Sequence, residues 1–473
     1  MHMSLPEKFP LPVTARRSPI RRLRNIVTAI AGTLFILVFL LAVRIYRTGT
    51  SDVIVADLPA FPTTPVIPKP PPPSPSQKNP ETTNEDEPLT PPAIFNPPKP
   101  NTERPMLRDD GVILTGVKNS TIWHSVGRHP ARKECWSYIS RFEPYVSPPQ
   151  EVLDLISNNN KPTNNRALIL RLSTGQPWKK EFTHHARALV LEAGHLANYD
   201  VHFLLHGNKP PAELRKWVQR HVPKEFRKIT QVFSTEDIKS WLNGTAAFKN
   251  IMEHNHLVIQ KFMTEHKQYD FVYSVESDLR QIGRWDNLLS DIDEEYKSHR
   301  ERQEPDQDMP EIPDLVTFEG LRRPVHDWLW ITYECVEGFG GHKNLRTSLG
   351  PMWGWSRRLI EKMNEYNAKG VNCFYELFSP TVAYNNNLTT FFYQHPLYCP
   401  RKSASGRSSL TLEDLGKNDP RTMQYEKPAR GCTYFFVNPH SQPFWEEWYR
   451  AAKNPDACWP PALIHPIKGD FFN

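Results

Sequence analysis

Glu276 and Asp278 are the clearest candidates for chemistry in this chain, because they end the apolar and aromatic run Tyr269–Val275. In an extended segment, side chains two positions apart point to the same face, so the two carboxylates should lie together. Open α/β sheets bind ligands beyond the carboxyl ends of their strands. Two hard oxygen ligands at such a position suit Mg²⁺ or Mn²⁺ holding the phosphates of a substrate. A polar strand end before a capped helix is the alternative interpretation.

Basic residues near this pair and near the end of the chain could complete a diphosphate site. The segment Leu463–Asp470 contains His465, which we predict as the third metal ligand, and Lys468, which we predict as a phosphate contact. His395, in the other late His-Pro pair, is the alternative third ligand. Arg280 and Arg284 are further candidates, because a guanidinium group matches phosphate oxygens bidentately. A structural histidine and arginines in ion pairs are the competing interpretations.

Two further acids lie among apolar and aromatic residues and are candidate catalytic groups. Glu376 occupies the sequence CFYELFSP, and Asp327 occupies HDWLW. A carboxylate in apolar surroundings must be paired or its pKa rises, which suits a catalytic base or nucleophile as well as a buried ion pair. Trp353 and Trp355 could stack on a sugar or a base, but such aromatic residues are more often part of a core.

The hydrophobic pattern around these residues predicts strands that alternate with helices. Expected strands are Arg166–Leu172, Tyr199–Leu205, Ile229–Phe233, Asp270–Val275 and Asp314–Phe318; expected helices are Glu181–Ala193, Pro211–Arg220, Ile251–His266 and Ser356–Asn367, the last with Ser356 as its N-cap. The charged stretch 291–308 should be an exposed loop or a helix face, and 402–427 should be a loop. This alternation predicts an α/β fold with a mostly parallel sheet flanked by helices.

The amino-terminal part of the chain predicts a membrane anchor. Residues 25–43 carry no charge and are mostly apolar. As a helix rising about 1.5 Å per residue, they approach the ~30 Å hydrocarbon core of a bilayer. Five arginines precede them, which places residues 1–24 in the cytoplasm and the remainder across the membrane. A cleaved signal peptide is the alternative. The proline-rich stretch 44–118 should be an extended, disordered stem, and 119–473 the lumenal domain.

Charge and cysteine content narrow the class of protein. The chain has a formal charge of +6, but seven arginines and Lys8 against Glu7 give residues 1–47 a charge of +7, so the rest carries −1. Without a basic field, nucleic acid is not an expected partner. Six cysteines beyond the anchor predict disulfides, and sequons at Asn119, Asn243 and Asn387 agree with a lumenal glycoprotein. The expected compartment is the Golgi or the endoplasmic reticulum.

Several motifs resemble a fungal family that is catalogued only as a domain of unknown function. They are the segment Tyr269–Arg280 with Gly283–Trp285, and also RFEPY at 141–145, VPKEF at 222–226, DWLW at 327–330 and the terminal His465-Pro466-x-Lys468. The resemblance covers residues 120 to 470. It adds no activity, because the family has no established function.

A second resemblance is to the fungal Golgi α-1,2-mannosyltransferases, which are type II proteins of GT-A fold that use Mn²⁺ and GDP-mannose. Val275-Glu276-Ser277-Asp278 is similar to their Val-Glu-Pro-Asp, and Tyr375-Glu376 with 395–400 (HPLYCP) looks like an altered form of a second element. The resemblance implies a metal-dependent transferase that takes a nucleotide sugar as donor and a glycan, protein or lipid as acceptor. A non-catalytic lumenal binding or scaffold protein and a membrane-anchored carbohydrate hydrolase are the alternatives.

Overall fold

The computed structural model describes residues 95–468 apart from 102–106, 109–110, 114–121, 127–133, 159–163, 176–177, 304–308, 325, 327, 401–432, 435–440 and 455–456. These residues all belong to the second of two compact units, Met1–Glu85 and Asp86–Asn473. The expected tail (1–24), membrane anchor (25–43) and loop (402–427) lie outside the described residues, as does most of the expected stem. Within the described part of the chain, no helix has the length and apolar character needed to cross a membrane.

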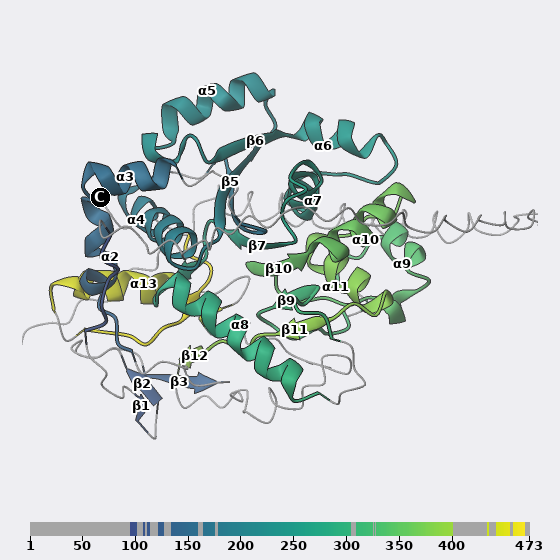
Figure 1. Cartoon of the computed structure of the whole chain (residues 1–473). Helices are drawn as coiled ribbons and strands as arrows, with labels where there is room; N and C mark the ends of the chain where they lie inside the picture. Colours follow the sequence, from purple (N-terminus) through teal and green to yellow (C-terminus); the bar gives the residue numbers. More distant parts are fainter. Residues whose placement is uncertain are drawn as a thin grey trace, which may run out of the picture. The chain divides into compact units, whose positions relative to one another are not determined.

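A seven-stranded sheet forms the centre of the described unit (Figure 1). Its order is β11 (Thr390–Phe392), β9 (Leu315–Thr317), β10 (Met352–Ser356), β7 (Phe271–Glu276), β4 (Arg166–Ser173), β5 (Asp200–Gly207) and β6 (Thr230–Ser234). Only β10 runs against its neighbours; the other strand pairs are parallel. The α/β class and the mostly parallel sheet predicted from the sequence are therefore confirmed.

Helices cover both faces of this sheet (Figure 1). One face packs against α2 (Tyr138–Val146), α3 (Gln150–Ser157), α4 (Lys180–Leu189) with its π-helical continuation Val190–Leu196, α5 (Pro211–His221), α8 (Trp285–Glu301) and α13 (Ser441–Arg450). The other face packs against α6 (Thr235–Leu242), α7 (His256–Glu265), α9 (Tyr333–Gly338), α10 (Arg357–Ala368) and α11 (Tyr375–Asn385). Short 3-10 turns occupy Lys224–Phe226, His342–Asn344 and Ala451–Lys453.

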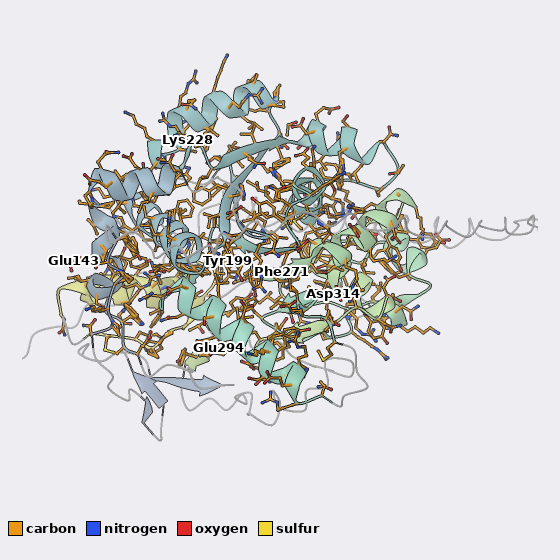
Figure 2. All side chains as sticks on the ribbon, in the orientation of Figure 1. Glu143, Tyr199, Lys228, Phe271, Glu294 and Asp314 are labelled. Carbon is orange, nitrogen blue, oxygen red and sulfur yellow. A yellow bond between two sulfur atoms is a disulfide. The ribbon has the colours of Figure 1, made fainter. Side chains whose placement is uncertain are left out.

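Strand β4 shows why the sheet needs helices on both sides. Leu168, Leu170 and Leu172 enter the first core, whereas Ala167 and Ile169 enter the second. Because neighbouring side chains of a strand point to opposite faces, an apolar run without polar alternation requires cover on both. In Figure 2, Phe271 lies among the crowded interior side chains, whereas the charged Glu143, Lys228 and Glu294 lie on exposed parts of the unit.

One predicted helix begins later than expected, and the stretch predicted as an exposed loop or a helix face is helical as far as Glu301. The expected helix Ile251–His266 begins only at His256, because Asn250 bonds locally to Glu253 through both its amide nitrogen and its amide oxygen and so favours a turn over residues 251–255. The charged stretch after residue 291 continues α8 to Glu301. In α10, Ser356 is the N-cap as predicted, and its hydroxyl accepts from the Leu359 N–H.

Two smaller sheets complete the described unit. β1 (Leu107–Arg108), β2 (Gly111–Ile113), β3 (Ile122–Val126) and β12 (Leu397–Pro400) form one, and β8 (Arg280–Gln281) pairs with β13 (Leu463–Ile464) in the other. Disulfides join Cys135 to Cys458 and Cys335 to Cys373, which confirms the expectation of disulfides. The side chains of Cys399 and Cys432 lie outside the described residues.

A buried ion pair ties the start of α8 to the helices on its face. The Arg141 guanidinium donates to both carboxylate oxygens of Glu192, at 2.7 and 2.8 Å, and to the Gly283 carbonyl at 3.0 Å. Glu192 also accepts from the Tyr145 hydroxyl and the Trp285 N–H. Neither charged side chain is exposed to solvent. The pair therefore fixes the loop that joins β8 to α8.

Removing one partner of this pair should be costly. Arg141→Met would leave the Glu192 carboxylate buried without its counter-charge, so we expect the free energy of unfolding to fall by about 3–5 kcal/mol. The double variant Arg141→Met/Glu192→Leu should regain part of that loss, although Tyr145 and Trp285 then lose an acceptor. Denaturant unfolding at pH 7 measures both. A single variant as stable as the wild type would contradict this account of the pair.

Candidate functional site

The two predicted carboxylates lie where the strand order of the sheet reverses. The chain passes outward from β4 through β5 and β6 and then returns to place β7 on the other side of β4. Ligand sites of open α/β sheets lie beyond the carboxyl ends of the strands at such a point. Glu276 is the last residue of β7, and its N–H donates to the Pro351 carbonyl at 2.8 Å. A turn follows, in which the Leu279 N–H donates to the Glu276 carbonyl at 3.1 Å, and this turn carries Asp278.

The last described segment of the chain brings His465 to these carboxylates. Leu463 and Ile464 pair with Gln281 and Arg280 in the β8–β13 ladder. Beyond the ladder, the Ile467 N–H donates to the Asp278 carbonyl at 2.8 Å. The backbone of this segment is therefore bonded to Asp278 itself and to the residues that follow it, and the His465 side chain lies beside the turn.

Glu276, Asp278 and His465 converge on one point. The His465 Nε2 atom is 3.1 Å from a Glu276 carboxylate oxygen and 3.3 Å from an Asp278 carboxylate oxygen. One ligand atom from each of the three residues lies within 4.8 Å of the others. An octahedral ion with ligands at about 2.1 Å sets neighbouring ligand atoms about 3 Å apart, so this spacing suits a Mg²⁺- or Mn²⁺-sized ion. Lys468 Nζ is 3.7 Å from the other Asp278 oxygen, so it lies at the same site.

The charges of the three groups depend strongly on one another. Burial disfavours the imidazolium, but Asp278 and Glu276 outweigh burial and raise the pKa of His465 to about 10. Burial likewise opposes the Asp278 carboxylate, yet His465 and Lys468 hold its pKa at about 2. Without a cation, a protonated imidazole therefore bridges two carboxylates. A metal ion would take the place of that proton, so metal affinity would rise with pH.

Arg171 belongs to this neighbourhood, although the sequence analysis did not single it out. It lies opposite Glu276 in the parallel β4–β7 pair, and its guanidinium is 3.0 Å from a Glu276 carboxylate oxygen. The same group donates to the Gly350 carbonyl at 3.0 Å and lies 5.9 Å from the centre of the Tyr375 ring. An arginine inside the apolar strand sequence RALILRL was the available signal, because a buried strand tolerates a charge only where a partner meets it.

Arg280 and Arg284, predicted as phosphate contacts, use their guanidinium groups within the protein. Arg280 is buried and donates to both carboxylate oxygens of Glu181 at 2.6 and 3.0 Å. It also donates to the carbonyls of Ser277 and Leu279, which flank Asp278. Arg284 pairs with Asp286. Neither guanidinium is directed at the three-residue cluster, because each is held by an acid outside it.

The remaining candidates have different positions. His395 is buried and does not belong to the three-residue cluster; its Nδ1 atom lies 3.1 Å from the Pro396 carbonyl oxygen, to which it can only donate, and burial lowers its pKa to about 4. Of the two predicted third ligands, only His465 meets the carboxylates among the described residues. Trp353 and Trp355 are core residues of β10, with 2% and 1% of their surface exposed. Asp327 lies outside the described residues, and its catalytic role stays a prediction.

Glu376 lies in the first turn of α11, close to the start of β10. Its carboxylate accepts from the Gly350 N–H at 3.2 Å and from the Tyr375 hydroxyl at 3.3 Å. Burial raises the pKa of Glu376 to about 7; the Gly350 N–H opposes the rise and the charge of Glu276 adds to it. A side chain on residue 350 would meet the Tyr375 ring at 2.6 Å, so glycine is needed for this close approach. Glu376 can therefore exchange a proton near neutral pH.

These features define an α/β protein with a candidate cation site at the point where the strand order of its sheet reverses. The chain belongs to the family described as a protein of unknown function (DUF3405), whose model matches residues 142–305 and 296–469. The resemblance to a family of unknown function drawn from the sequence is thereby confirmed. No curated protein matches the chain.

Solved structures offer a distant likeness. One is a protein from Bacillus anthracis described as a glucose-1-phosphate thymidylyltransferase, in a complex with sucrose. It shares 8% sequence identity with this chain, and the match covers 55% of this chain and 98% of that one with a TM-score of 0.28.

Arg280 should affect metal binding through the turn that carries Asp278. Arg280→Lys keeps the charge but cannot hold Glu181 bidentately together with the Ser277 and Leu279 carbonyls, so we expect Mn²⁺ affinity to fall roughly 10-fold or more. Isothermal titration calorimetry measures this. Arg187→Lys is the matched control, because Arg187 pairs with Glu225 and donates to the Tyr145 and Val146 carbonyls, none of which belongs to the turn. Equal losses in both variants would contradict a specific role for Arg280.

Glu376 should make the stability of the protein depend on pH. Its pKa rises from 4.5 in the unfolded chain to about 7 in the folded protein. Between these values the folded state keeps a proton that the unfolded state has lost, so stability falls as pH rises through this window. In Glu376→Gln that contribution is absent, and the stability difference between wild type and variant should decrease by up to roughly 3 kcal/mol from pH 4.5 to pH 7. Urea unfolding in EDTA at several pH values measures it; a constant difference would contradict the raised pKa.

Proposed function

We propose that this protein is a metal-dependent glycosyltransferase with a GT-A-like fold. It would transfer a sugar from a nucleotide diphosphate donor to a glycan, protein or lipid acceptor. The observation that carries the proposal is the convergence of Glu276, Asp278 and His465 at the end of β7. The reversal of strand order at β4 and β7 supports it, since ligands of open α/β sheets bind there.

The three residues would hold Mn²⁺ or Mg²⁺ through two carboxylate oxygens and one imidazole nitrogen. A bound divalent cation supplies Lewis-acid stabilisation for the negative charge that develops on a leaving nucleotide diphosphate. His465 would have to be neutral to act as a ligand. The negative charges of Glu276 and Asp278, which raise its pKa, would then be offset by the metal ion instead of by the proton. Further coordination positions would remain for phosphate oxygens, because such ions take six ligands and the protein offers three.

The charges around the site favour a diphosphate once a cation is present. Arg171 and Lys468 formally offset Glu276 and Asp278, so a divalent ion leaves the cluster with a net positive charge. Lys468 is the more accessible of the two cations, with 72% of its side chain exposed, and three rotatable donors make it suited to a mobile phosphate. We therefore propose Lys468 as a phosphate contact, as predicted from the sequence. Arg171, and not Arg280 or Arg284, is the arginine that we propose as a second phosphate contact.

Glu376 would act on the transferred sugar or on the acceptor. A base should have a pKa close to the working pH, and burial brings Glu376 to about 7. Its bond from the Gly350 N–H fixes the carboxylate relative to the strand β10 that pairs with β7. We therefore propose Glu376 as the base that accepts the acceptor's proton or as the group that faces the anomeric carbon.

The proposed setting is the lumen of the Golgi or the endoplasmic reticulum, reached as a type II membrane protein. Buried disulfides support an oxidising compartment. Two sequon asparagines, Asn243 and Asn387, are exposed at helix ends or turns with positive φ, which suits glycosylation in that compartment. The anchor at residues 25–43 and the sequon at Asn119 lie outside the described residues and remain part of the proposal.

A non-catalytic lumenal binding protein is the second candidate. The observation in its favour is that a protonated His465 satisfies both carboxylates without any ion, as its pKa of about 10 indicates. In such a protein the cluster would be a structural ion pair. The two candidates differ in whether a divalent cation and a nucleotide sugar bind at all.

A panel of UDP- and GDP-sugars tests the proposal. We expect the purified full chain to release nucleoside diphosphate from at least one donor with Mn²⁺ or Mg²⁺ and not with EDTA. Asp278→Asn should lower kcat/KM by about 100-fold or more, because it removes a ligand that acts on the transition state. Glu361→Gln, an exposed acid on α10, is the control and should match the wild type.

Two outcomes would count against the transferase. Turnover that survives EDTA or Asp278→Asn would show that the cluster is not the metal site of the reaction. If no donor is turned over, and neither Mn²⁺ nor any nucleotide sugar raises the melting temperature, the non-catalytic protein is the better account.

A further inference from the structure

An exposed group of apolar and aromatic side chains lies just before α9 and at its first residue. Leu329, Trp330 and Tyr333, which we call the aromatic shelf, have 92%, 36% and 73% of their surface exposed. They follow one another within five residues, and they account for half of the large hydrophobic side chains that are exposed in the described part of the chain. Exposed aromatic residues that are clustered in this way mark binding sites more often than exposed single residues do.

The buried ring of Phe374 and the partly buried ring of Trp328 pack under the aromatic shelf. Trp330 stacks on Phe374, with ring centres 4.8 Å apart and an angle of 14° between their planes. Trp328 meets the same Phe374 ring edge-on at 5.7 Å. Phe374 is itself 92% buried. The indole of Trp330 is therefore held in one orientation while part of it stays open to solvent, so that little conformational freedom remains to be lost on binding.

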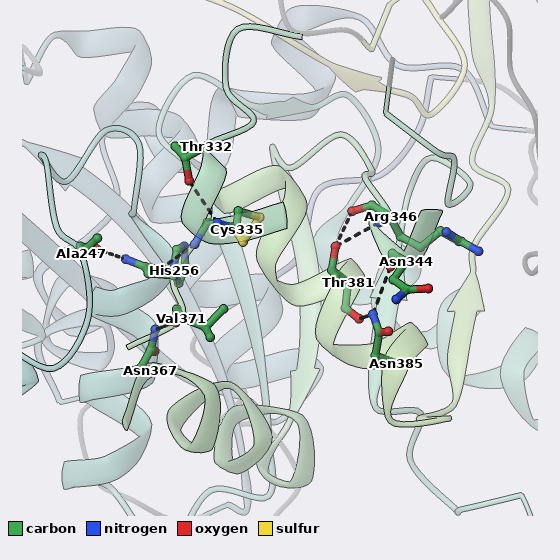
Figure 3. The surroundings of a disulfide bond; sticks show 12 residues. Ala247, His256, Thr332, Cys335, Asn344, Arg346, Asn367, Val371, Thr381 and Asn385 are labelled. Carbon is green, nitrogen blue, oxygen red and sulfur yellow. Dashed lines mark hydrogen bonds between the residues drawn. A yellow bond between two sulfur atoms is a disulfide. The ribbon is translucent and has the colours of Figure 1, made fainter. Parts of the chain in front are cut away.

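A disulfide fixes the shelf to the helix that carries Glu376. Cys335, in the first turn of α9, is bonded to Cys373, which directly precedes Phe374. The Thr332 hydroxyl caps α9 by accepting from the Cys335 N–H at 3.3 Å. Figure 3 shows Thr332 and Cys335 together beside this disulfide. The shelf residues and the start of α11 are thus held in one place by a covalent bond and by ring contacts.

The rings continue from the shelf to the candidate site. Phe374 contacts Tyr375 with ring centres 4.7 Å apart. The Tyr375 hydroxyl donates to Glu376, and the Tyr375 ring lies below the guanidinium of Arg171, which pairs with Glu276. Phe374 therefore lies between Trp330 and Tyr375, and Tyr375 contacts both Glu376 and Arg171. The shelf is thereby linked to the candidate site through the adjacent rings of Phe374 and Tyr375.

We propose that the aromatic shelf binds the acceptor, and that the acceptor is a carbohydrate. A pyranose ring has a face of C–H groups that packs on a flat aromatic ring, while its hydroxyl groups remain directed to water or to polar side chains. A sugar stacked on Trp330 would be separated from Glu376 by the rings of Phe374 and Tyr375. The proposal rests on the proposed function in naming the sugar as an acceptor, and it narrows the acceptor from a glycan, protein or lipid to a glycan.

Binding of methyl glycosides to the purified full chain tests this directly. The probes are the methyl glycosides of mannose, glucose, galactose and N-acetylglucosamine and their disaccharides, followed by saturation-transfer NMR and by tryptophan fluorescence. We expect at least one probe to bind, with Kd increased about 10-fold or more in Trp330→Ala and restored to within about 3-fold of wild type in Trp330→Phe. Ile139→Ala, which removes an exposed apolar side chain from α2, is the matched control and should bind like the wild type.

Tyr333→Ser provides a second variant in case Trp330→Ala fails to fold, and it should also weaken binding. The proposal is overturned if no glycoside binds, or if Trp330→Ala and Tyr333→Ser both bind like the wild type. It is also overturned if the wild type binds vesicles of phosphatidylcholine and phosphatidylserine through Trp330 but binds no glycoside. Because the assay contains EDTA and no nucleotide, its result is independent of whether the chain transfers sugar from a nucleotide donor.

Discussion

Two carboxylates that share one strand end repel each other, and the candidate site depends on the positive charge between them. The backbone keeps the two residues close together, because the Glu276 N–H donates to the Pro351 carbonyl and the Asp278 carbonyl accepts from the Ile467 N–H. The Nε2 atom of His465 meets both carboxylates at 3.1 and 3.3 Å. Either a proton on that nitrogen or a divalent ion in its place can offset the two charges. A fold that maintains this geometry keeps a position that a cation can occupy.

The arrangement requires contacts between parts of the chain that are far apart in sequence. His465 reaches Glu276 across 189 residues, and Arg280 reaches Glu181 across 99. The β8–β13 ladder links the two ends of the site, because Arg280 pairs through its backbone with Ile464, next to His465. The same Arg280 side chain holds the carbonyls on either side of Asp278. Position, rather than charge alone, is what Arg280 contributes to the site.

The sequence predicted what local patterns and residue chemistry determine. Apolar strands of β-branched and aromatic residues identified β4, β5, β7 and β9 to within one or two residues, and the i, i+2 acids with a late histidine identified the cluster. Partners were not predictable, because an arginine's role depends on the carboxylate that the fold places beside it. Arg280 was therefore assigned to a phosphate when it pairs with Glu181, and Arg171 was missed. The support of Trp330 by Phe374 depends on a similar long-range contact.

Anomalous X-ray diffraction from crystals of the full chain grown with MnCl₂ tests the central claim most directly, because it locates the ion itself. The account predicts one strong manganese peak bonded to Glu276, Asp278 and His465 at about 2.1–2.3 Å, with no such peak in crystals of His465→Ala grown under the same conditions. An imidazole still hydrogen-bonded to both carboxylates in saturating Mn²⁺, with no peak between the three residues, would contradict it.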